Sequence, residues 1–236
     1  MKRTRKRKKL PSASRHSERS PLWYALLLLP CIWMGNGCRL PARDRLTLQN
    51  NARAVLLARQ KIAAAGHLLH DGDLVLRTGN DFISQTLRQF SPQDKTYSHC
   101  GIVLIENGEP YVYHAIGGED NPDEYLRRER FASFCDPAYN TGFGIYRYCL
   151  SPAAHERLDS VVLKWYSEKI QFDLKFDLQT DNRMYCSEFA CKALDKASGT
   201  PGFIPVSHIG TFAYVAIDNL FLNPHADKVL RVRFFN

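Results

Sequence analysis

The chain is predicted to fold as an α+β domain in which a central antiparallel sheet is flanked by helices. Short apolar segments rich in β-branched residues cluster in the middle of the 236 residues, and longer segments with helical spacing lie on both sides of them. The composition, with 44% hydrophobic and 24% charged residues, is globular and excludes a wholly disordered or collagen-like chain. No internal repeat is visible.

The net charge of +8 lies at the N-terminus. Residues 1–20 hold nine Lys or Arg side chains against one acid, Glu18, and residues 21–37 carry no charge. The remainder of the chain has 23 basic and 23 acidic residues. Because that remainder is neutral overall, a basic nucleic-acid-binding domain is not expected.

Residues 1–37 are predicted to be a secretory signal peptide, because a basic run precedes an apolar stretch over 22–34 and then small residues. About 13 apolar residues at roughly 1.5 Å each are too few to cross a bilayer comfortably. The boundary resembles a bacterial lipobox, which implies cleavage before Cys38, lipidation of Cys38 and attachment to a membrane. Because Arg39 follows, where inner-membrane lipoproteins of this kind usually have Asp, the protein is expected in the outer membrane, facing the periplasm.

Two other interpretations of the N-terminus also predict that the domain is exported. The apolar stretch could remain uncleaved as an anchor, or it could be removed as a plain signal with an accidental cysteine. The lipobox resemblance departs from the usual pattern at Gly35, where Leu is common. Cys31 is a competing lipidation candidate, but Pro30 is a poor residue before a cleavage site.

The first elements of the exported part follow from hydrophobic spacing. Residues 38–67 are expected to form a tether and then a helix over 46–65, where apolar residues recur at spacings of three and four until Gly66. A polar turn leads into a short apolar strand over 74–77. Residues 81–90 have helical spacing, with an apolar side expected to pack inward.

A hairpin occupies the centre of the chain. Residues 98–105 form a predicted strand rich in β-branched side chains, and Asn107-Gly108 is a strong signal for a tight turn. The return strand is expected over 111–116, paired with the first.

The second half is predicted to contain three helices and two strands. A polar helix is expected over 123–134, a strand over 144–149 and a long amphipathic helix over 152–170. A helix over 184–197 and a closing strand over 228–235 complete the domain.

Two motifs carry the candidate chemistry: Tyr97-Ser98-His99-Cys100-Gly101-Ile102 at the start of a strand, and Tyr185-Cys186-Ser187-Glu188-Phe189 at the start of a helix. A thiol in the first turn of a helix meets unpaired N–H groups and the positive end of the helix dipole, which favour the nucleophilic thiolate. A neighbouring His can take the thiol proton. Glu188 is expected to brace or cap the helix.

His114 is suited to orient that base, because it lies on the strand paired with the strand of His99. Taken singly, Cys186, His99 and His114 are each more typical of packing or ordinary hydrogen bonding than of catalysis. Their combination in this order is what predicts a catalytic set.

Seven cysteines are present, and five remain in the exported domain: Cys100, Cys135, Cys149, Cys186 and Cys191. An odd number suggests at least one functional free thiol, and no disulfide can be assigned from the sequence. No CxxC pair, P-loop or GxGxxG motif is present. No metal site and no cofactor are therefore expected.

The two motifs, together with Gly72-Asp73-Leu74-Val75 upstream, resemble the permuted papain-like amidases, the YiiX/YaeF-like branch of the NlpC/p60 superfamily. In that branch the strand with His precedes the helix with Cys, as it does here. The resemblance covers roughly residues 68–215, and residues 172–177 look like the Tyr-Asp-x-x-Phe segment of the family. It implies a circularly permuted papain-like fold for residues 68–236.

The resemblance implies Cys186 as the nucleophile and His99 as the base. The third polar position falls on His114, where many members of the branch carry Glu. That departure makes the site similar to lecithin retinol acyltransferase-type relatives, which pair two His with one Cys.

The predicted activity is that of an exported cysteine hydrolase that cleaves an amide bond through a thioester, with murein peptides as the obvious substrate pool. The backbone N–H of Cys186 is one expected oxyanion donor, and Tyr97 or Tyr185 could supply another. One alternative is a lipid acyl hydrolase or acyltransferase, with residues 81–90 lining an acyl groove. The other is a non-catalytic binding lipoprotein of the envelope.

Overall fold

The computed structural model describes residues 42–118, 121 and 123–235. The predicted signal peptide over 1–37, the lipidation candidates Cys31 and Cys38 and the first part of the tether lie outside these residues. Residues 46–236 form one compact unit, and the description below concerns that unit. Within the described residues, no helix has the length and apolar character needed to cross a membrane.

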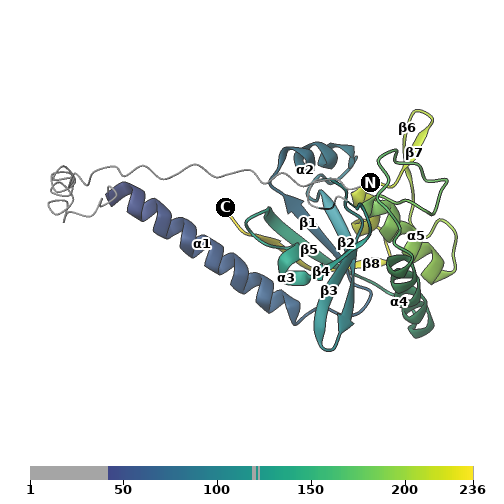
Figure 1. Ribbon diagram of the computed structural model, residues 1–236, viewed down its shortest axis with the longest axis horizontal. Helices are drawn as coiled ribbons and strands as arrows, with labels where there is room; N and C mark the ends of the chain where they lie inside the picture. The colour runs from purple at the N-terminus through teal and green to yellow at the C-terminus, as the bar shows by residue number, and fades with distance from the viewer. Residues whose placement is uncertain (1–41, 119–120, 122, 236) are drawn as a thin grey trace, which may run out of the picture. The chain divides into compact units, whose positions relative to one another are not determined.

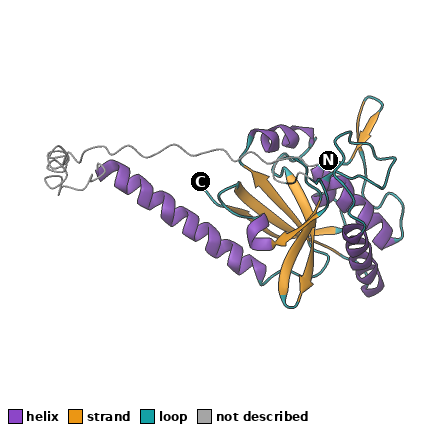
Figure 2. Cartoon of the chain, in the orientation of Figure 1, coloured by secondary structure: helices purple, strands orange, loops and turns teal. Residues whose placement is uncertain are grey.

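A six-stranded sheet forms the centre of the domain, with its strands in the order β4-β3-β2-β1-β5-β8 (Figures 1 and 2). All neighbouring strands are antiparallel. The strands are β1 (Leu74–Gly79), β2 (His99–Glu106), β3 (Glu109–His114), β4 (Arg127–Arg130), β5 (Asn140–Tyr148) and β8 (Ala226–Arg233). The predicted α+β class with a central antiparallel sheet is confirmed.

Helices lie on both faces of this sheet. They are α1 (Ala42–Gly66), α2 (Phe82–Leu87), α3 (Phe131–Phe134), α4 (Pro152–Ser167), α5 (Cys186–Ser198) and α6 (Ile217–Phe221), and α2 continues into a 3₁₀ turn, η2 (Arg88–Phe90). A second hairpin, made of β6 (Ser207–Ile209) and β7 (Phe212–Tyr214), stands apart from the main sheet (Figure 1).

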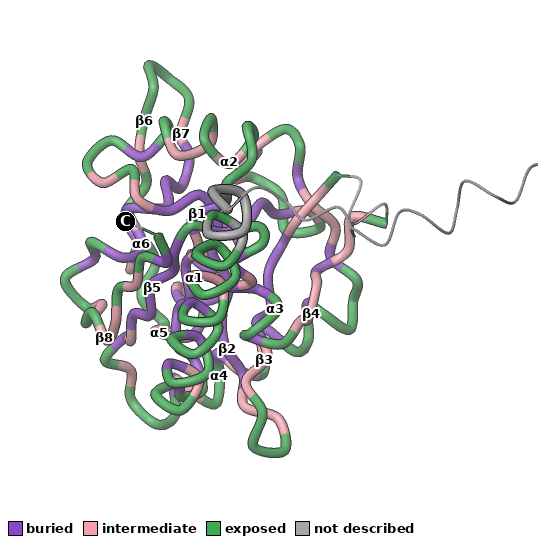
Figure 3. Tube along the Cα trace, turned by 90° about the vertical axis from the view of Figure 1, so that its left-hand side faces the viewer, coloured by how far each residue is buried: buried purple, intermediate pink, exposed green. Residues whose placement is uncertain are grey.

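Side chains along the central strands point alternately to the two faces of the sheet, and this divides the core into two layers. Even-numbered residues of β1 and β2, such as Leu76 and Ile102, pack with α4, α5 and α6. Odd-numbered residues, such as Val75 and Val103, pack with α1 and α3 on the opposite face. The central strands are accordingly buried in Figure 3.

The predicted hairpin at Asn107-Gly108 is confirmed. Both residues have positive φ values, 52° and 83°, which a two-residue turn of this kind requires. The turn sets the register Ile102↔Tyr113, and β3 ends at His114. This register brings the end of β3 next to the beginning of β2.

The predicted helix over 123–134 is wrong. Residues 127–130 form β4 along the edge of β3, and only the last four residues are helical, as α3. The Arg128 guanidinium stacks 3.4 Å from the centre of the Tyr111 ring and pairs with Glu106. These contacts across strands outweigh the helical spacing of an isolated polar segment.

Two helix starts and three short elements also differ from the sequence-based expectation. Helix α1 begins at Ala42, so the expected tether over 39–45 overlaps it. Helix α5 begins at Cys186 and not at residue 184, because Tyr185 has an extended backbone. The short elements β6, β7 and α6 were not predicted, since each has only three to five residues.

Candidate active site

Cys186 is the first residue of α5, and several polar contacts fix the start of this helix. Glu188 accepts a hydrogen bond at Oε2 from the backbone N–H of Tyr185, at 3.2 Å, and so caps the helix as the sequence suggests. The Ser187 hydroxyl donates to the carbonyl of Val215, at 2.7 Å. The helix start is therefore held both from within and from the segment that follows β7.

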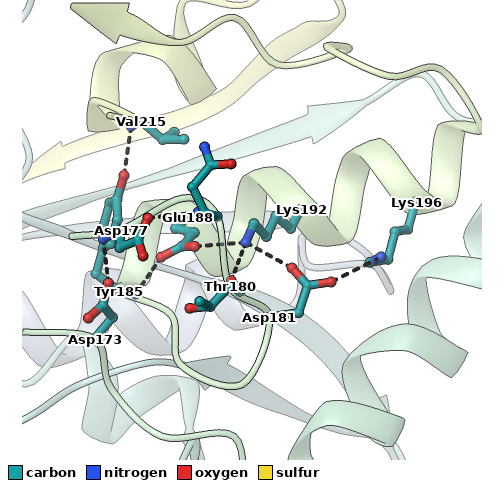
Figure 4. Close-up of polar contacts among 10 residues, drawn as sticks. Asp173, Asp177, Thr180, Asp181, Tyr185, Glu188, Lys192, Lys196 and Val215 are labelled. Carbon is teal, nitrogen blue, oxygen red and sulfur yellow. Dashed lines mark hydrogen bonds and ion pairs between the residues drawn. The ribbon is translucent and has the colours of Figure 1, made fainter. Parts of the chain in front are cut away.

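A network of charged side chains connects α5 to the segment that precedes it (Figure 4). Glu188 is fully buried and pairs with Lys192 at 2.9 Å. Asp181 pairs with both Lys192 and Lys196, at 2.8 and 3.5 Å. Because Asp181 belongs to the segment that leads into α5, the network ties this segment to the helix and so positions Cys186.

The Cys186 thiol lies in an environment that favours the thiolate. The adjacent thiol of Cys100 and the backbone N–H groups of Cys100 and Ser187 hydrogen-bond to its sulfur, and Arg77 adds a positive charge. Together they lower the pKa of Cys186 against the effect of burial. Burial raises the pKa of Cys100 instead, so Cys100 remains a thiol.

His99 and His114 form a direct pair, since Nε2 of His99 lies 2.8 Å from Nδ1 of His114. Both rings are buried. The close approach depends on Gly101, where a Cβ atom would lie 2.6 Å from a methyl group of Val112 and 3.0 Å from the Cβ atom of His114. Only glycine leaves β3 room to bring His114 to His99.

Glu129 extends this pair to a chain of three side chains. Its Oε1 atom lies 2.7 Å from Nε2 of His114, on the side opposite His99. Burial raises the pKa of Glu129, but the hydrogen bond with His114 and the positive charge of Arg77 lower it on balance, so the carboxylate is ionised. Burial lowers the pKa of both His99 and His114, so both rings are neutral near pH 7.

Arg77 lies beside this chain. It is opposite His99 in the β1–β2 register and donates a hydrogen bond to the carbonyl of Phe134, at 3.2 Å. Its guanidinium lies 4.7 Å from the centre of the Phe134 ring. The positive charge of Arg77 acts on both His99 and Cys186.

The structure therefore brings His99 and His114 into contact and places Cys186 against the next residue of β2, Cys100. Within the described part of the chain, no hydrogen bond joins the Cys186 sulfur to His99. Catalytic hydrogen bonds are often long before substrate binds and tighten in the complex. Five free cysteines are present among the described residues, so the odd thiol count inferred from sequence matches free thiols in the structure.

Tyr97 and Tyr185 have other contacts than those expected of oxyanion donors. The Tyr185 hydroxyl accepts a hydrogen bond from the backbone N–H of Val215, at 2.7 Å. Tyr97 packs edge-on against Tyr146 and Phe221. Among the described residues, neither hydroxyl bonds to the Cys186 thiol, and an oxyanion role for either tyrosine stays a prediction.

Sequence reasoning missed Glu129 and Arg77. Glu129 belongs to the segment that was predicted to be helical, and a strand interpretation of Arg127-Arg128-Glu129-Arg130 would have shown one acid among three bases. Arg77 was assigned to a strand, but its position opposite His99 depends on the register between β1 and β2, which the sequence does not specify.

The chain is related to a bacterial protein of uncharacterised function. No family model matches the chain. The uncharacterised protein YiiX of Escherichia coli (strain K12) is 24% identical over 131 residues, which are 54% of this chain and 58% of that protein, little more than half of the relative's length. A crystal structure of the metalloprotein YiiX from Escherichia coli O157:H7, a DUF1105 protein, has a TM-score of 0.57 at 18% identity, over 70% of this chain and 98% of that one.

These comparisons support a YiiX-like protein with a mixed α+β fold, and the fold is compatible with the papain-like class. Membership of the NlpC/p60 superfamily and the circular permutation of the fold stay predictions.

Proposed function

We propose that this protein is an exported cysteine hydrolase that cleaves an amide bond, with Cys186 as the nucleophile and His99 as the general base. The observation that supports this most is the chain of hydrogen bonds from Glu129 through His114 to His99, beside a thiol with a lowered pKa at the start of a helix. The same logic of nucleophile, base and orienting group operates in other thiol hydrolases.

The hydrogen bonds select one tautomer of each ring. The ionised carboxylate of Glu129 accepts the Nε2–H of His114, so Nδ1 of His114 carries a lone pair. That lone pair accepts the Nε2–H of His99, which leaves Nδ1 of His99 without a proton. His99 is therefore set to receive a proton at Nδ1, and the negative charge of Glu129 stabilises the imidazolium that forms.

The reaction follows from these states. The Cys186 sulfur attacks the carbonyl carbon of the amide, and its proton passes to Nδ1 of His99. The tetrahedral intermediate collapses to a thioester when the C–N bond breaks and His99 returns the proton to the leaving amine. Water then attacks the thioester and gives up a proton to His99, and the released thiolate restores Cys186. Backbone N–H groups at the start of α5 would donate hydrogen bonds to the developing oxyanion.

The active arrangement requires the Cys186 thiol and the His99 ring to meet. Cys186 lies at the start of a helix and His99 at the start of a strand, where β2 does not yet pair with β3. We expect a change of side-chain rotamer to bring the two groups together, and the positive charge of Arg77 favours the thiolate that forms when His99 takes the proton.

The YiiX structure is that of a metalloprotein, so we tested whether a metal fits here. Among the described residues, no group of three or more His, Cys, Asp and Glu side chains is arranged to hold a metal ion. Both ring nitrogens of His114 are already engaged by His99 and Glu129. The residues do not fit a metal site, and the mechanism above uses none.

A second candidate is acyl hydrolysis or acyl transfer on lipids, for which the thioester chemistry is the same. One observation favours it. The predicted inward packing of residues 81–90 is wrong, because α2 buries none of its residues, and Phe82 and Ile83 are 85% and 68% exposed. Apolar side chains are therefore exposed just after β1, the strand whose Arg77 lies opposite His99.

Product analysis by mass spectrometry tests both candidates. The full chain is incubated separately with murein peptides and with envelope lipids, beside Cys186→Ala and the matched control Cys149→Ala, which changes an exposed free thiol. New peptide termini that require Cys186 alone support the amidase, and acyl release or transfer that requires it supports the lipid enzyme. Products from neither pool would leave a non-catalytic envelope protein, or a substrate outside both pools, as the better account.

A further inference from the structure

We propose that an apolar edge of this domain, with an arginine-lined hollow beside it, docks on the surface of an anionic phospholipid bilayer. The apolar edge consists of five side chains from α2, η2 and the β6–β7 hairpin: Phe82, Ile83, Phe90, Ile209 and Phe212. The inference does not rest on the proposed hydrolase activity, because it concerns a surface and not the chemistry of Cys186.

The side chains of the apolar edge are unusually exposed for their type. The exposed fractions are 85% for Phe82, 68% for Ile83, 54% for Ile209, 48% for Phe90 and 45% for Phe212. Single exposed apolar residues are ordinary, but a group that comes from two segments far apart in the sequence is a mark of an interaction surface.

Tyr214 joins the two segments. Its hydroxyl donates a hydrogen bond to the carbonyl of Phe90, at 2.9 Å, and its ring lies edge-on to the Phe90 ring at 6.4 Å. On its other side it stacks on Phe212, at 6.0 Å. Both views place α2 and the β6–β7 hairpin at the same end of the domain (Figures 1 and 3).

A basic hollow of about 260 Å³ adjoins the apolar edge, and its charged lining residues are Arg88, Arg231 and Arg233. Arg88 lies in η2, the turn that also carries Phe90, so the hollow reaches one of the segments that form the apolar edge. Arg231 pairs with Asp94 at 3.3 Å. Within the described residues, no ion pair engages Arg88 or Arg233, and the hollow keeps a positive charge.

The two acidic groups near the surface, Asp81 and Asp94, offset the charge of the three arginines only in part. Asp81 caps α2 through Ser84, to which it is bonded by two hydrogen bonds. Asp94 is occupied by Arg231 and by the Thr96 backbone N–H. The Arg88 guanidinium donates hydrogen bonds to the Lys95 carbonyl and to Gln85 but has no acidic partner among the described residues. Its charge and that of Arg233 thus remain to attract phosphate groups.

The combination of chemistries selects a lipid surface as the partner. Aromatic and aliphatic side chains that project from short segments fit the boundary between headgroups and acyl chains, and flanking arginines fit anionic headgroups. Each basic residue near an anionic bilayer adds roughly fivefold to binding. A protein partner would need a broader apolar face than two short segments with protruding tips provide.

The test is local hydrogen–deuterium exchange of the full chain reconstituted in vesicles of phosphatidylcholine with and without phosphatidylglycerol. The N-terminal apolar stretch can hold the chain on both kinds of vesicle, so only local protection reports on this surface. We expect amide exchange in peptides over 82–90 and 207–214 to slow at least fivefold on the anionic vesicles relative to the neutral ones.

Two variants separate the contributions. Phe82→Ser with Ile83→Ser, at exposed positions where folding is not at risk, is expected to abolish the protection, and Arg88→Gln with Arg233→Gln to remove its dependence on anionic lipid. Leu163→Ser, an exposed apolar residue of α4, is the matched control and should change nothing. Cys186→Ala should also retain the protection, which separates this surface from the proposed activity.

Two results would overturn the proposal. One is equal exchange of both peptides on neutral and anionic vesicles. The other is protection without lipid that grows with protein concentration, which would assign the apolar edge to contact between copies of the chain.

Discussion

The Nε2 atom of His99 lies 2.8 Å from the Nδ1 atom of His114, with the two rings nearly perpendicular at 86°. One of the two nitrogens must donate and the other accept, so the protonation of each ring depends on the other. Glu129 decides between the alternatives, because a carboxylate only accepts and therefore requires the proton of His114 on Nε2. A residue on a strand at the edge of the sheet thus sets the basic atom of His99.

Glu129→Gln is expected to lower kcat about 100-fold with little change in KM. The amide of Gln can donate to Nε2 of His114, which would move the proton to Nδ1 and reverse the hydrogen bond to His99. Steady-state kinetics on the substrate identified for the wild type measures the effect.

Glu109→Gln is the control for this substitution, because Glu109 lies exposed at the other end of β3 and, among the described residues, pairs only with Arg130. Equal activities of the wild type and Glu129→Gln would show that Glu129 does not position the base.

Gly101→Ala is expected to destabilise the protein by about 1–3 kcal/mol and to break the His99–His114 pair. The new methyl group would lie 2.6 Å from Val112 and 3.0 Å from His114, inside a sheet that cannot easily spread. Urea unfolding measures the stability, and NMR spectra of the imidazole nitrogens report the hydrogen bond.

Gly66→Ala is the matched control. Its added Cβ atom would have no neighbour closer than 3.9 Å, and we expect unfolding within about 0.5 kcal/mol of the wild type. If Gly101→Ala behaved in the same way, close approach at Gly101 would not be what brings the two rings together.

The sequence was sufficient to predict the elements that have a strong local signal. The hairpin at Asn107-Gly108, the long helix α4 and the cysteine at the start of α5 all follow from patterns within a few residues. The sequence also predicts that His99 and His114 lie close together, because a two-residue turn fixes which residues of the two strands face each other.

The remainder of the site depends on contacts between distant segments. Residues 127–130 have no strong strand pattern by themselves, and the edge of β3 makes them a strand. The role of Glu129 could not be predicted without that pairing. The proximity of Cys100 to Cys186 likewise depends on how α5 packs on the sheet, which no local pattern specifies.

Cys100→Ala is expected to raise the pKa of Cys186 and to slow its alkylation near pH 7. The Cys100 thiol is the strongest single influence that lowers the pKa of Cys186, and alanine removes it while keeping a small apolar side chain. The rate of iodoacetamide modification at Cys186, followed by peptide mass spectrometry from pH 5 to 10, gives the titration midpoint. Cys135→Ala is the control, since Cys135 is buried with α1 and α3 on the opposite face of the sheet. A midpoint that Cys100→Ala leaves unchanged would remove Cys100 from the activation of the nucleophile.

Glu188→Gln is expected to change the stability of the protein in a pH-dependent way. Relative to the wild type, the variant should be more stable above pH 7 than it is near pH 5. Burial raises the pKa of Glu188 to about 7, above the value near 4.5 of an unfolded chain. The folded state therefore binds this proton more tightly than the unfolded state. Its contribution to stability is fully present below pH 4.5 and is lost as pH rises through 7.

The full loss amounts to about 3.5 kcal/mol, since the two pKa values differ by about 2.5 units and each unit corresponds to about 1.4 kcal/mol. Glutamine cannot ionise, so the variant lacks this pH dependence while it can still accept the N–H of Tyr185. Urea unfolding of the wild type and of Glu188→Gln at pH 5 and pH 8 shows how much the free energy of unfolding of each protein changes with pH. If the stability of both proteins changed with pH in the same way, the ion pair with Lys192 would keep Glu188 charged at both pH 5 and pH 8. The charged network would then stabilise α5 through a salt bridge and not through a neutral carboxyl group.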